Sequence, residues 1–223
     1  MKKAQGLFNI FFDQGLVEHN GEMESIFTQI FHKHTWGGIS RSGTGSDCVQ
    51  TAFIQKELPQ LFKKYGCSRI ADAPCGDFFW MQHVPVEYYC GADVVEPLIE
   101  QNKTLYAHQK RHFIHLDITK EVLPAVDLIL CRDALVHFSY GDIGNAIFRF
   151  KQSGSTYLLT TSYTGSHHKD LNIPMSTGGW RPLNLCKEPF CFPDPLEIIC
   201  EHSTENPLHA DKSLFLWRLA DIF

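Results

Sequence analysis

Apolar residues along this chain recur with two different periods, one typical of helices and one typical of strands. Spacings of three and four residues, which place side chains on one face of a helix, occur over four segments: 23–34, 47–65, 97–106 and 141–152. Short apolar runs of the kind found in buried strands lie at 70–72, 88–93, 111–117, 126–131 and 156–163. Two more such runs, 196–201 and 213–219, follow each other with only a polar turn between them. Strands that alternate with helices predict an α/β fold with a mostly parallel sheet, and the last two runs predict an antiparallel hairpin.

The segment before the first predicted strand contains predicted helices and a loop but no predicted strand. We expect residues 1–65 to form a small helical cap with a lid, and residues 66–223 to form the main domain. The apolar patch at residues 7–12 is short, is interrupted by Asn9 and lacks a small-residue cleavage site, so it favours an amphipathic helix over a secretory signal. Pro59 predicts a kink or a break in the second helix. No apolar run approaches the length of a membrane span, which indicates a soluble, cytoplasmic protein.

Composition and charge narrow the function classes. The 223 residues fit one ordinary domain, and a formal net charge of −5 gives no electrostatic footprint for duplex nucleic acid. None of the 8 cysteines belongs to a C-x-x-C pair, so neither a zinc cluster nor a disulfide framework is indicated, and we expect reduced thiols and no bound metal. The adjacent His167 and His168 point in different directions, and we expect them to be solvated rather than metal-binding.

The first candidate chemistry lies in the segment RIADAPCGDFFWM. Its apolar run ends in Asp72, a tight turn with Gly76 follows, and the aromatic residues after the turn predict the start of a helix. Strand, turn and helix in this order are typical of a nucleotide-binding crevice. A dinucleotide site requires G-x-G-x-x-G so that a pyrophosphate can approach bare backbone, but Pro74 and Phe78 stand at the first and third glycine positions. Asp77 would also repel a pyrophosphate, whereas it would suit a ligand with an ammonium and a sulfonium group.

Two further strands also end in an aspartate. Asp93 lies 17 residues beyond Gly76, near the spacing at which an acid after the second strand accepts hydrogen bonds from the hydroxyls of a ribose. Asp117 ends the third strand. Each aspartate alone could cap a helix, but three of them at nucleotide spacing, with Asp72, favour a binding site for an adenosine group.

At these residues the chain resembles the class I S-adenosylmethionine (SAM)-dependent methyltransferases, whose first motif runs acid-x-G-x-G-x-G in its fullest form. The chain departs from that motif at Pro74 and Phe78. The resemblance covers about residues 66–223 and implies a Rossmann-like seven-stranded sheet, mostly parallel with a C-terminal antiparallel hairpin, and SAM as the cofactor. The residues that it places at the cofactor are Asp72, Pro74, Gly76, Asp77, Asp93, Val94, Asp117, Ile118 and Arg132.

A glycine- and serine-rich loop, TWGGISRSGTGSD, lies between two predicted helices of the cap. Its backbone N–H groups, its hydroxyls and Arg41 can together hold a carboxylate or a phosphate. Many methyltransferases close an N-terminal arm over the methionine end of the cofactor. The resemblance therefore makes this loop a candidate lid, with Trp36, Ser42 and Gly43 on the cofactor and Arg41 on the acceptor. The alternative is a flexible surface loop whose last polar residues cap the next helix.

The candidate catalytic residues follow the fourth strand. If residues 132–138 are helical, Asp133 and His137 lie four apart on one face, where a carboxylate that orients an imidazole makes a workable general base. The sequence LVHF is similar to the L-x-H segment of many of these methyltransferases, in which the histidine often packs beside the cofactor without acid–base work. Both roles stay open.

The irregular region 164–195 is too long for a plain connection and carries aromatic residues and an arginine, so we assign it to the acceptor pocket. The acceptor-binding candidates are Arg41, Trp80, Trp180, Arg181 and Asn184. The sequence thus predicts methyl transfer by an SN2 reaction to an oxygen or nitrogen of an unidentified acceptor, in the first place a small molecule, with a protein or glycan left open. Two alternatives are an NAD-type oxidoreductase in the same crevice and a SAM-binding module without turnover.

Overall fold

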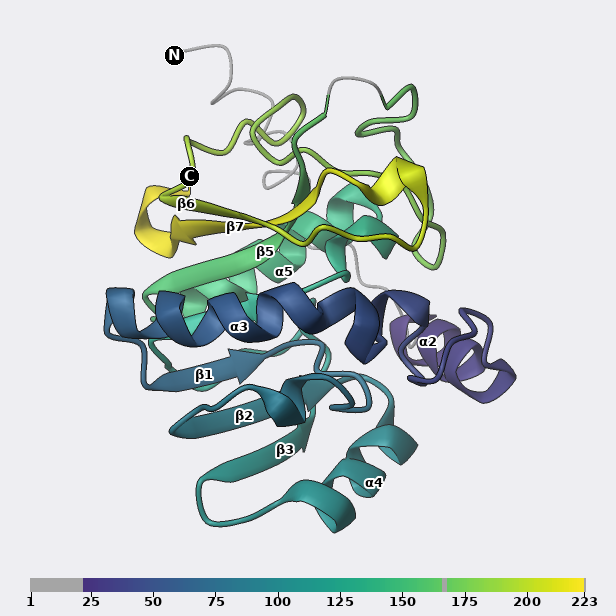
Figure 1. Cartoon of the computed structure of the whole chain (residues 1–223). Coiled ribbons are helices and arrows are strands. Elements are labelled where there is room, and N and C mark those ends of the chain that lie inside the picture. The colour runs from purple at the N-terminus through teal and green to yellow at the C-terminus, as the bar shows by residue number, and fades with distance from the viewer. Residues whose placement is uncertain (1–21, 166–167, 223) are drawn as a thin grey trace.

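The computed structural model describes residues 22–165 and 168–222. Within them, strands form a seven-stranded sheet in the order β3-β2-β1-β4-β5-β7-β6 (Figure 1). Neighbours from β3 to β5 pair parallel, whereas β7 runs antiparallel to both β5 and β6. The predicted Rossmann-like sheet with its antiparallel hairpin is therefore confirmed. Its strands are β1 (Arg69–Asp72), β2 (Tyr88–Asp93), β3 (Arg111–His115), β4 (Leu128–Cys131), β5 (Tyr157–Tyr163), β6 (Glu197–Cys200) and β7 (Lys212–Arg218).

The composition of each strand explains its place in the sheet. All residues of β4 are buried, as expected of a parallel strand that is covered on both faces. Its side chains alternate between two core clusters, with Leu128 and Leu130 in one and Ile129 and Cys131 in the other. At the edge of the sheet, β3 buries only Phe113. The continuously apolar strand β4 thus lies in the centre of the sheet, and β3, which mixes apolar and polar residues, lies at an edge.

Helices cover both faces of the sheet. They are α2 (Glu22–Lys33), α3 (Cys48–Tyr65), α4 (Glu96–Tyr106) and α5 (Tyr140–Gln152). Figure 1 shows α3 lying across one face of the sheet with α5 behind the strands. Leu58 of α3 and Ile99 of α4 belong to one core cluster, whereas Ile147 and Phe150 of α5 belong to the other. The four helices predicted from the apolar periodicity therefore form where that periodicity placed them.

The proline in α3 does not divide the helix. Leu58, Leu61 and Phe62 flank Pro59 and are buried in the same core cluster as the central strands. Their packing outweighs the backbone hydrogen bond that the proline cannot donate, so the predicted break into two pieces is wrong. The helix ends at Gly66, whose left-handed φ of 67° suits a glycine. The division of the chain at residue 65 stays a prediction.

Two predicted helical segments are not α-helices. The aromatic residues after β1 form turns and a short 3₁₀ turn, Met81–His83, because Phe78 has a left-handed φ of 58°. That backbone lets the Phe78 ring pack 4.8 Å from the ring of Tyr89. The segment 132–138 contains only the 3₁₀ turn Leu135–His137, and Asp133 has a φ of 52°. Asp133 and His137 therefore do not share a helix face.

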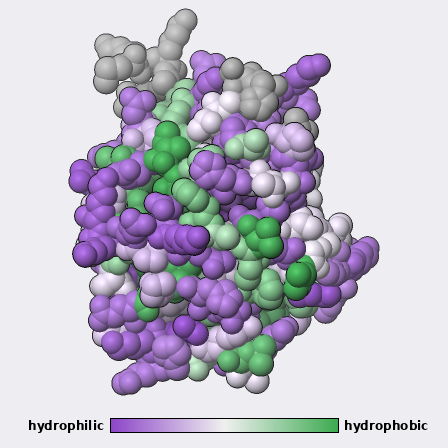
Figure 2. Space-filling view, viewed as in Figure 1, coloured by the Kyte–Doolittle hydropathy of each residue, from purple (hydrophilic) through white to green (hydrophobic). Residues whose placement is uncertain are grey.

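The surface over α3 is mostly hydrophilic, with apolar side chains in small groups (Figure 2). Val49 and Phe53 of α3 are 80% and 39% exposed, which is ordinary for scattered surface residues. Among the described residues, none of the helices has the length and apolar character needed to span a bilayer. The helix predicted over residues 7–12 lies outside the described residues.

Candidate functional site

A cavity opens at the carboxyl ends of the parallel strands. The chain progresses from β1 to β3 in one direction across the sheet and continues from β4 on the other side of β1, so the carboxyl ends of β1 and β4 border a topological switch point. The cavity contains about 1000 Å³ of space not filled by atoms, its open mouth included. Its wall includes these predicted site residues: Trp36, Arg41, Ser42, Asp72, Pro74, Gly76, Asp77, Trp80, Asp93, Val94, Asp117, Ile118, Arg132, Asp133 and His137.

The three strand-end aspartates meet in this cavity and are buried. Asp93 accepts hydrogen bonds of 3.0 Å from the backbone N–H groups of Gly76 and Val95, while its burial raises its pKa to about 6. Asp72 accepts a 2.7 Å hydrogen bond from the Tyr89 hydroxyl, and burial raises its pKa to about 7. Asp117 uses one oxygen to accept from the backbone N–H and hydroxyl of Thr119, as a capping residue does. Asp72 and Asp93 thus hold protons more tightly than exposed carboxyls.

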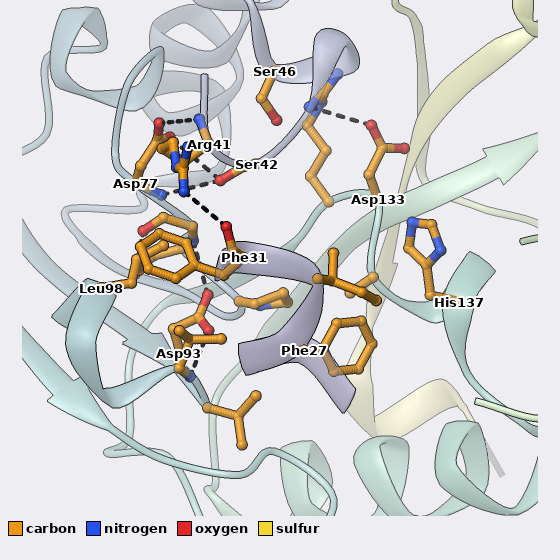
Figure 3. Close-up of a pocket in the computed structure, with 18 of the residues that line it drawn as sticks. Phe27, Phe31, Arg41, Ser42, Ser46, Asp77, Asp93, Leu98, Asp133 and His137 are labelled. Atoms are coloured by element: carbon orange, nitrogen blue, oxygen red, sulfur yellow. Dashed lines mark hydrogen bonds and ion pairs between the residues drawn. The ribbon is translucent and has the colours of Figure 1, made fainter. Parts of the chain in front are cut away.

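The glycine- and serine-rich loop lies over the motif turn. The Asp77 carboxylate accepts from the Ser40 hydroxyl (2.9 Å), the Arg41 backbone N–H (2.7 Å) and the Ser42 hydroxyl (3.3 Å). A side chain at Gly76 would overlap the Ser42 hydroxyl. We call residues 40–46 the strap. It is tied to the end of β1 through Asp77, and Figure 3 shows Arg41 and Ser42 beside that carboxylate.

The far end of the strap is tied to the other side of the cavity. Arg132 donates a 2.8 Å hydrogen bond to the carbonyl of Gly45, and the Thr44 hydroxyl contacts Glu205. Asp47 begins α3 without a side-chain cap; its carboxylate instead accepts from the backbone N–H groups of Ile39 and Ser40. The loop is therefore held at both ends and at its base.

A buried ionic network joins this end of the strap to the hairpin. Arg132 donates to both oxygens of Glu201, and Lys212 lies 2.7 Å from Asp133 and 3.3 Å from Glu201. Arg132 is also 3.3 Å from Asp133, so two cations face two carboxylates. The cations hold the pKa of Asp133 well below its usual range despite its burial. Sequence reasoning missed Glu201 and Lys212, although charged residues at the ends of an apolar hairpin were a signal.

His137 is held by a loop rather than by Asp133. Its Nδ1 lies 2.7 Å from the carbonyl oxygen of Gly179, which only accepts, so Nδ1 carries the hydrogen and Nε2 keeps its lone pair. Burial lowers the pKa of His137. The Trp36 ring is stacked on the imidazole at 4.7 Å between centroids. The hydrogen-bonded Asp133–His137 pair that the helical spacing suggested is thus replaced by a backbone partner.

The other predicted residues do not line the cavity. Trp180 is 42% exposed and packs near His209, and the Asn184 side chain accepts from the backbone N–H of Cys186. Arg181 is buried and donates to the carbonyl of Phe138, while its Nε and Nη2 have no partner among the described residues. Gly43 packs closely on the Trp36 side chain. The region 164–195 contacts the site through the Gly179 carbonyl, which accepts a hydrogen bond from His137, and not through the side chains of Trp180, Arg181 or Asn184.

His168 also differs from its prediction. Its side chain is 3% exposed, and Nε2 lies 2.8 Å from a carboxylate oxygen of Asp211, so this histidine is not solvated. His167 lies outside the described residues. Among residues 22–165 and 168–222, no cluster of three or more histidine, cysteine or acidic side chains could hold a metal ion.

Comparison with known proteins identifies the fold. No family model matches the sequence, and no curated protein matches it. The solved structure of human N-acetylserotonin methyltransferase in complex with SAM matches with a TM-score of 0.59 at 12% identity, over 96% of this chain and 66% of that chain. Magnesium protoporphyrin IX methyltransferase from Synechocystis PCC 6803 with bound SAM matches with a TM-score of 0.55 at 12% identity, over 87% and 96%. The chain therefore has the class I SAM-dependent methyltransferase fold.

Proposed function

We propose that this protein binds SAM in the cavity and transfers its methyl group to an oxygen or nitrogen of a small-molecule acceptor. One observation carries the proposal: the strand-end aspartates and His137 line the same cavity. The fold, which it shares with SAM-binding methyltransferases, supports the same assignment. The acceptor is not fixed by the fold, because folds host many functions.

The donor set fits SAM better than a dinucleotide. Asp93 would hold the ribose hydroxyls, and Asp117 with Ile118 would border the adenine. Gly76 and Ser42 would lie near the methionine end. A pyrophosphate needs bare backbone at this turn, but the Ser42 hydroxyl occupies the space above Gly76 and the Asp77 carboxylate adjoins it. The NAD-type alternative therefore has the weaker support.

The side chains near His137 suit proton removal from an acceptor. When bound, SAM supplies a methyl group on a positively charged sulfur. Nε2 of His137 would accept the O–H or N–H proton of the acceptor, which would free the acceptor's lone pair to take the methyl group. Asp133 stays ionised and favours the protonated ring of His137, so it would stabilise the imidazolium. Trp36, which is stacked on the imidazole, would limit the access of water to this part of the cavity.

Calorimetric titration with SAM and with S-adenosylhomocysteine tests the cofactor. We expect saturable binding of both, and at least 10-fold weaker binding in Asp93→Ala. The matched control is Asp221→Ala, since the Asp221 side chain is 51% exposed and lies at the distant end of β7. Saturable NADH binding without SAM binding, or undiminished SAM binding in Asp93→Ala, would contradict the proposal. Release of S-adenosylhomocysteine with an acceptor separates an enzyme from a binding module.

A further inference from the structure

The part of the cavity around His137 has a distinctive lining. Trp36 stacks on the imidazole, and the Phe27 ring lies 6.1 Å from the Trp36 ring and 5.9 Å from that of Phe138. In Figure 3, Phe27, His137 and Asp133 lie on one side of the view, and Asp77 and Asp93 lie on the other. Flat aromatic walls favour a flat apolar ligand, because rings pack well in offset or tilted contacts.

Two polar groups at this end, Nε2 of His137 and the Asp133 carboxylate, are hydrogen-bond acceptors. Nε2 of His137 keeps a lone pair because Nδ1 donates to Gly179. Asp133 is a carboxylate that faces the cavity with its side chain 25% exposed. A ligand that satisfies either group must bring a hydrogen-bond donor.

The cations at the His137 end of the cavity are committed to other partners, and Arg41 lies at the opposite end beside Asp77 (Figure 3). The Arg41 guanidinium donates to the Phe31 carbonyl and lies over the Phe31 ring. Arg132 and Lys212 are bound in the network with Glu201 and Asp133, and Arg181 does not line the cavity. A carboxylate or phosphate on the ligand would therefore lie beside the Asp133 carboxylate without a cation of its own.

A positively charged ligand finds no uncompensated carboxylate in the network at Asp133. Lys212 and Arg132 already neutralise Asp133 and Glu201, so the four side chains carry no net charge. A cation buried there would lose its hydration without a free counter-charge.

We propose that the acceptor is an uncharged, flat aromatic compound that presents an O–H or N–H group to His137. This inference rests on the proposed function and narrows its acceptor to one chemical class. We expect aromatic carboxylates, phosphates and ammonium compounds to bind more weakly, because the charges next to His137 are already paired with one another.

The test uses three probes with one ring system: 2-naphthol, 2-naphthoate and 2-naphthylmethylammonium. Each is titrated at pH 7 into the protein saturated with S-adenosylhomocysteine, with tryptophan fluorescence and calorimetry as readouts. We expect 2-naphthol to bind at least 30-fold more tightly than either charged probe. Trp36→Ala should weaken 2-naphthol binding at least 10-fold, and S-adenosylhomocysteine binding to the same variant is measured in parallel. Phe53→Ala, which removes a ring outside the cavity, should change neither.

The failure of this inference is separable from the failure of the proposed function. Equal or tighter binding of a charged probe, or no binding of 2-naphthol, overturns the acceptor class while S-adenosylhomocysteine still binds. If S-adenosylhomocysteine itself does not bind, the proposed function fails first. The comparison of probes uses the wild-type protein, so it does not depend on the folding of any variant.

Discussion

At the scale of single residues, the environment of His137 decides whether it can act as a base. The Gly179 carbonyl fixes the tautomer, and burial lowers the pKa, so the ring is neutral at neutral pH. Asp133 favours the protonated ring, whereas Arg181 and Lys212 oppose it. The structure thus keeps a lone pair on Nε2 without a direct bond to a carboxylate.

Replacement of this histidine tests that role. We expect His137→Gln to lower kcat with 2-naphthol by about 100-fold or more, since the base is lost while the size and polarity of the side chain are largely kept. The affinity for S-adenosylhomocysteine should be unchanged. In the wild type, the rate should fall only at a pH below the usual range of histidine titration, because burial lowers the pKa of His137 and the ring protonates later as the pH drops. An unchanged kcat in the variant would mean that His137 only packs in the site.

The buried carboxyl of Asp72 gives a prediction about stability. Its pKa is raised from 3.8 to about 7, so it stabilises the folded state most at low pH, and this contribution is lost as the pH rises from about 4 to about 7. Asp72→Asn keeps an acceptor for the Tyr89 hydroxyl but removes the charge. We expect the variant to gain about 4 kcal/mol of unfolding free energy relative to wild type between pH 4 and pH 8. Urea unfolding checks this, and a pH-independent difference would contradict it.

At the scale of elements, the strap and the hairpin are joined by polar contacts rather than by packing. The strap is tied by Asp77 on one side and by Arg132 on the other. It covers the turn at which the methionine end of the cofactor would lie, so exchange of the cofactor requires the strap to move. Asp77 accepts three hydrogen bonds from the strap, whereas Arg132 donates one to it, so Asp77 is the main latch.

Two variants separate a latch from a cofactor ligand. Asp77→Asn weakens the latch and could also remove a cofactor contact, whereas Ser40→Ala removes one latch bond from a buried residue that does not line the cavity. We expect S-adenosylhomocysteine to dissociate about 10-fold faster from Asp77→Asn and measurably faster from Ser40→Ala in stopped-flow experiments. Ser25→Ala, on the exposed side of α2, is the control. If only Asp77→Asn changes the rate, Asp77 acts on the cofactor directly.

We expect the loss of a single charge from the ionic network to lower the unfolding free energy strongly. Lys212→Met leaves Glu201 without one of its two cations and Asp133 without its 2.7 Å partner. We expect a loss of about 3 kcal/mol or more in unfolding free energy, because the remaining buried carboxylates are then undercompensated. Lys64→Met removes an ion pair whose lysine is 61% exposed, and it should cost less than about 1 kcal/mol. If the two variants lose similar amounts of unfolding free energy, the buried network contributes no more to stability than an exposed ion pair does.

At the scale of the whole molecule, much of the fold could be predicted because periodicity reports burial. The sheet with its hairpin and the helices from α2 to α5 follow from that signal. The shared position of Asp72, Asp93 and Asp117 follows as well, because carboxyl ends of parallel strands meet at one edge.

The partners of Asp133 and His137 could not be predicted, because they come from residues that are distant in the sequence. Lys212 reaches Asp133 across 79 positions, and the Gly179 carbonyl reaches His137 across 42. Spacing along a helix suggested a different partner for His137, and the left-handed backbone at Asp133 removes that helix. A backbone conformation of this kind is set by tertiary packing, which a single sequence does not display.

A crystal structure of the protein with S-adenosylhomocysteine is the most direct test of the cofactor site. The predicted result is the ribose on the Asp93 carboxylate, the adenine beside Ile118 and the amino-acid end under the strap near Gly76. A ligand bound elsewhere, or an unfilled cavity at saturating concentration, would contradict the assignment.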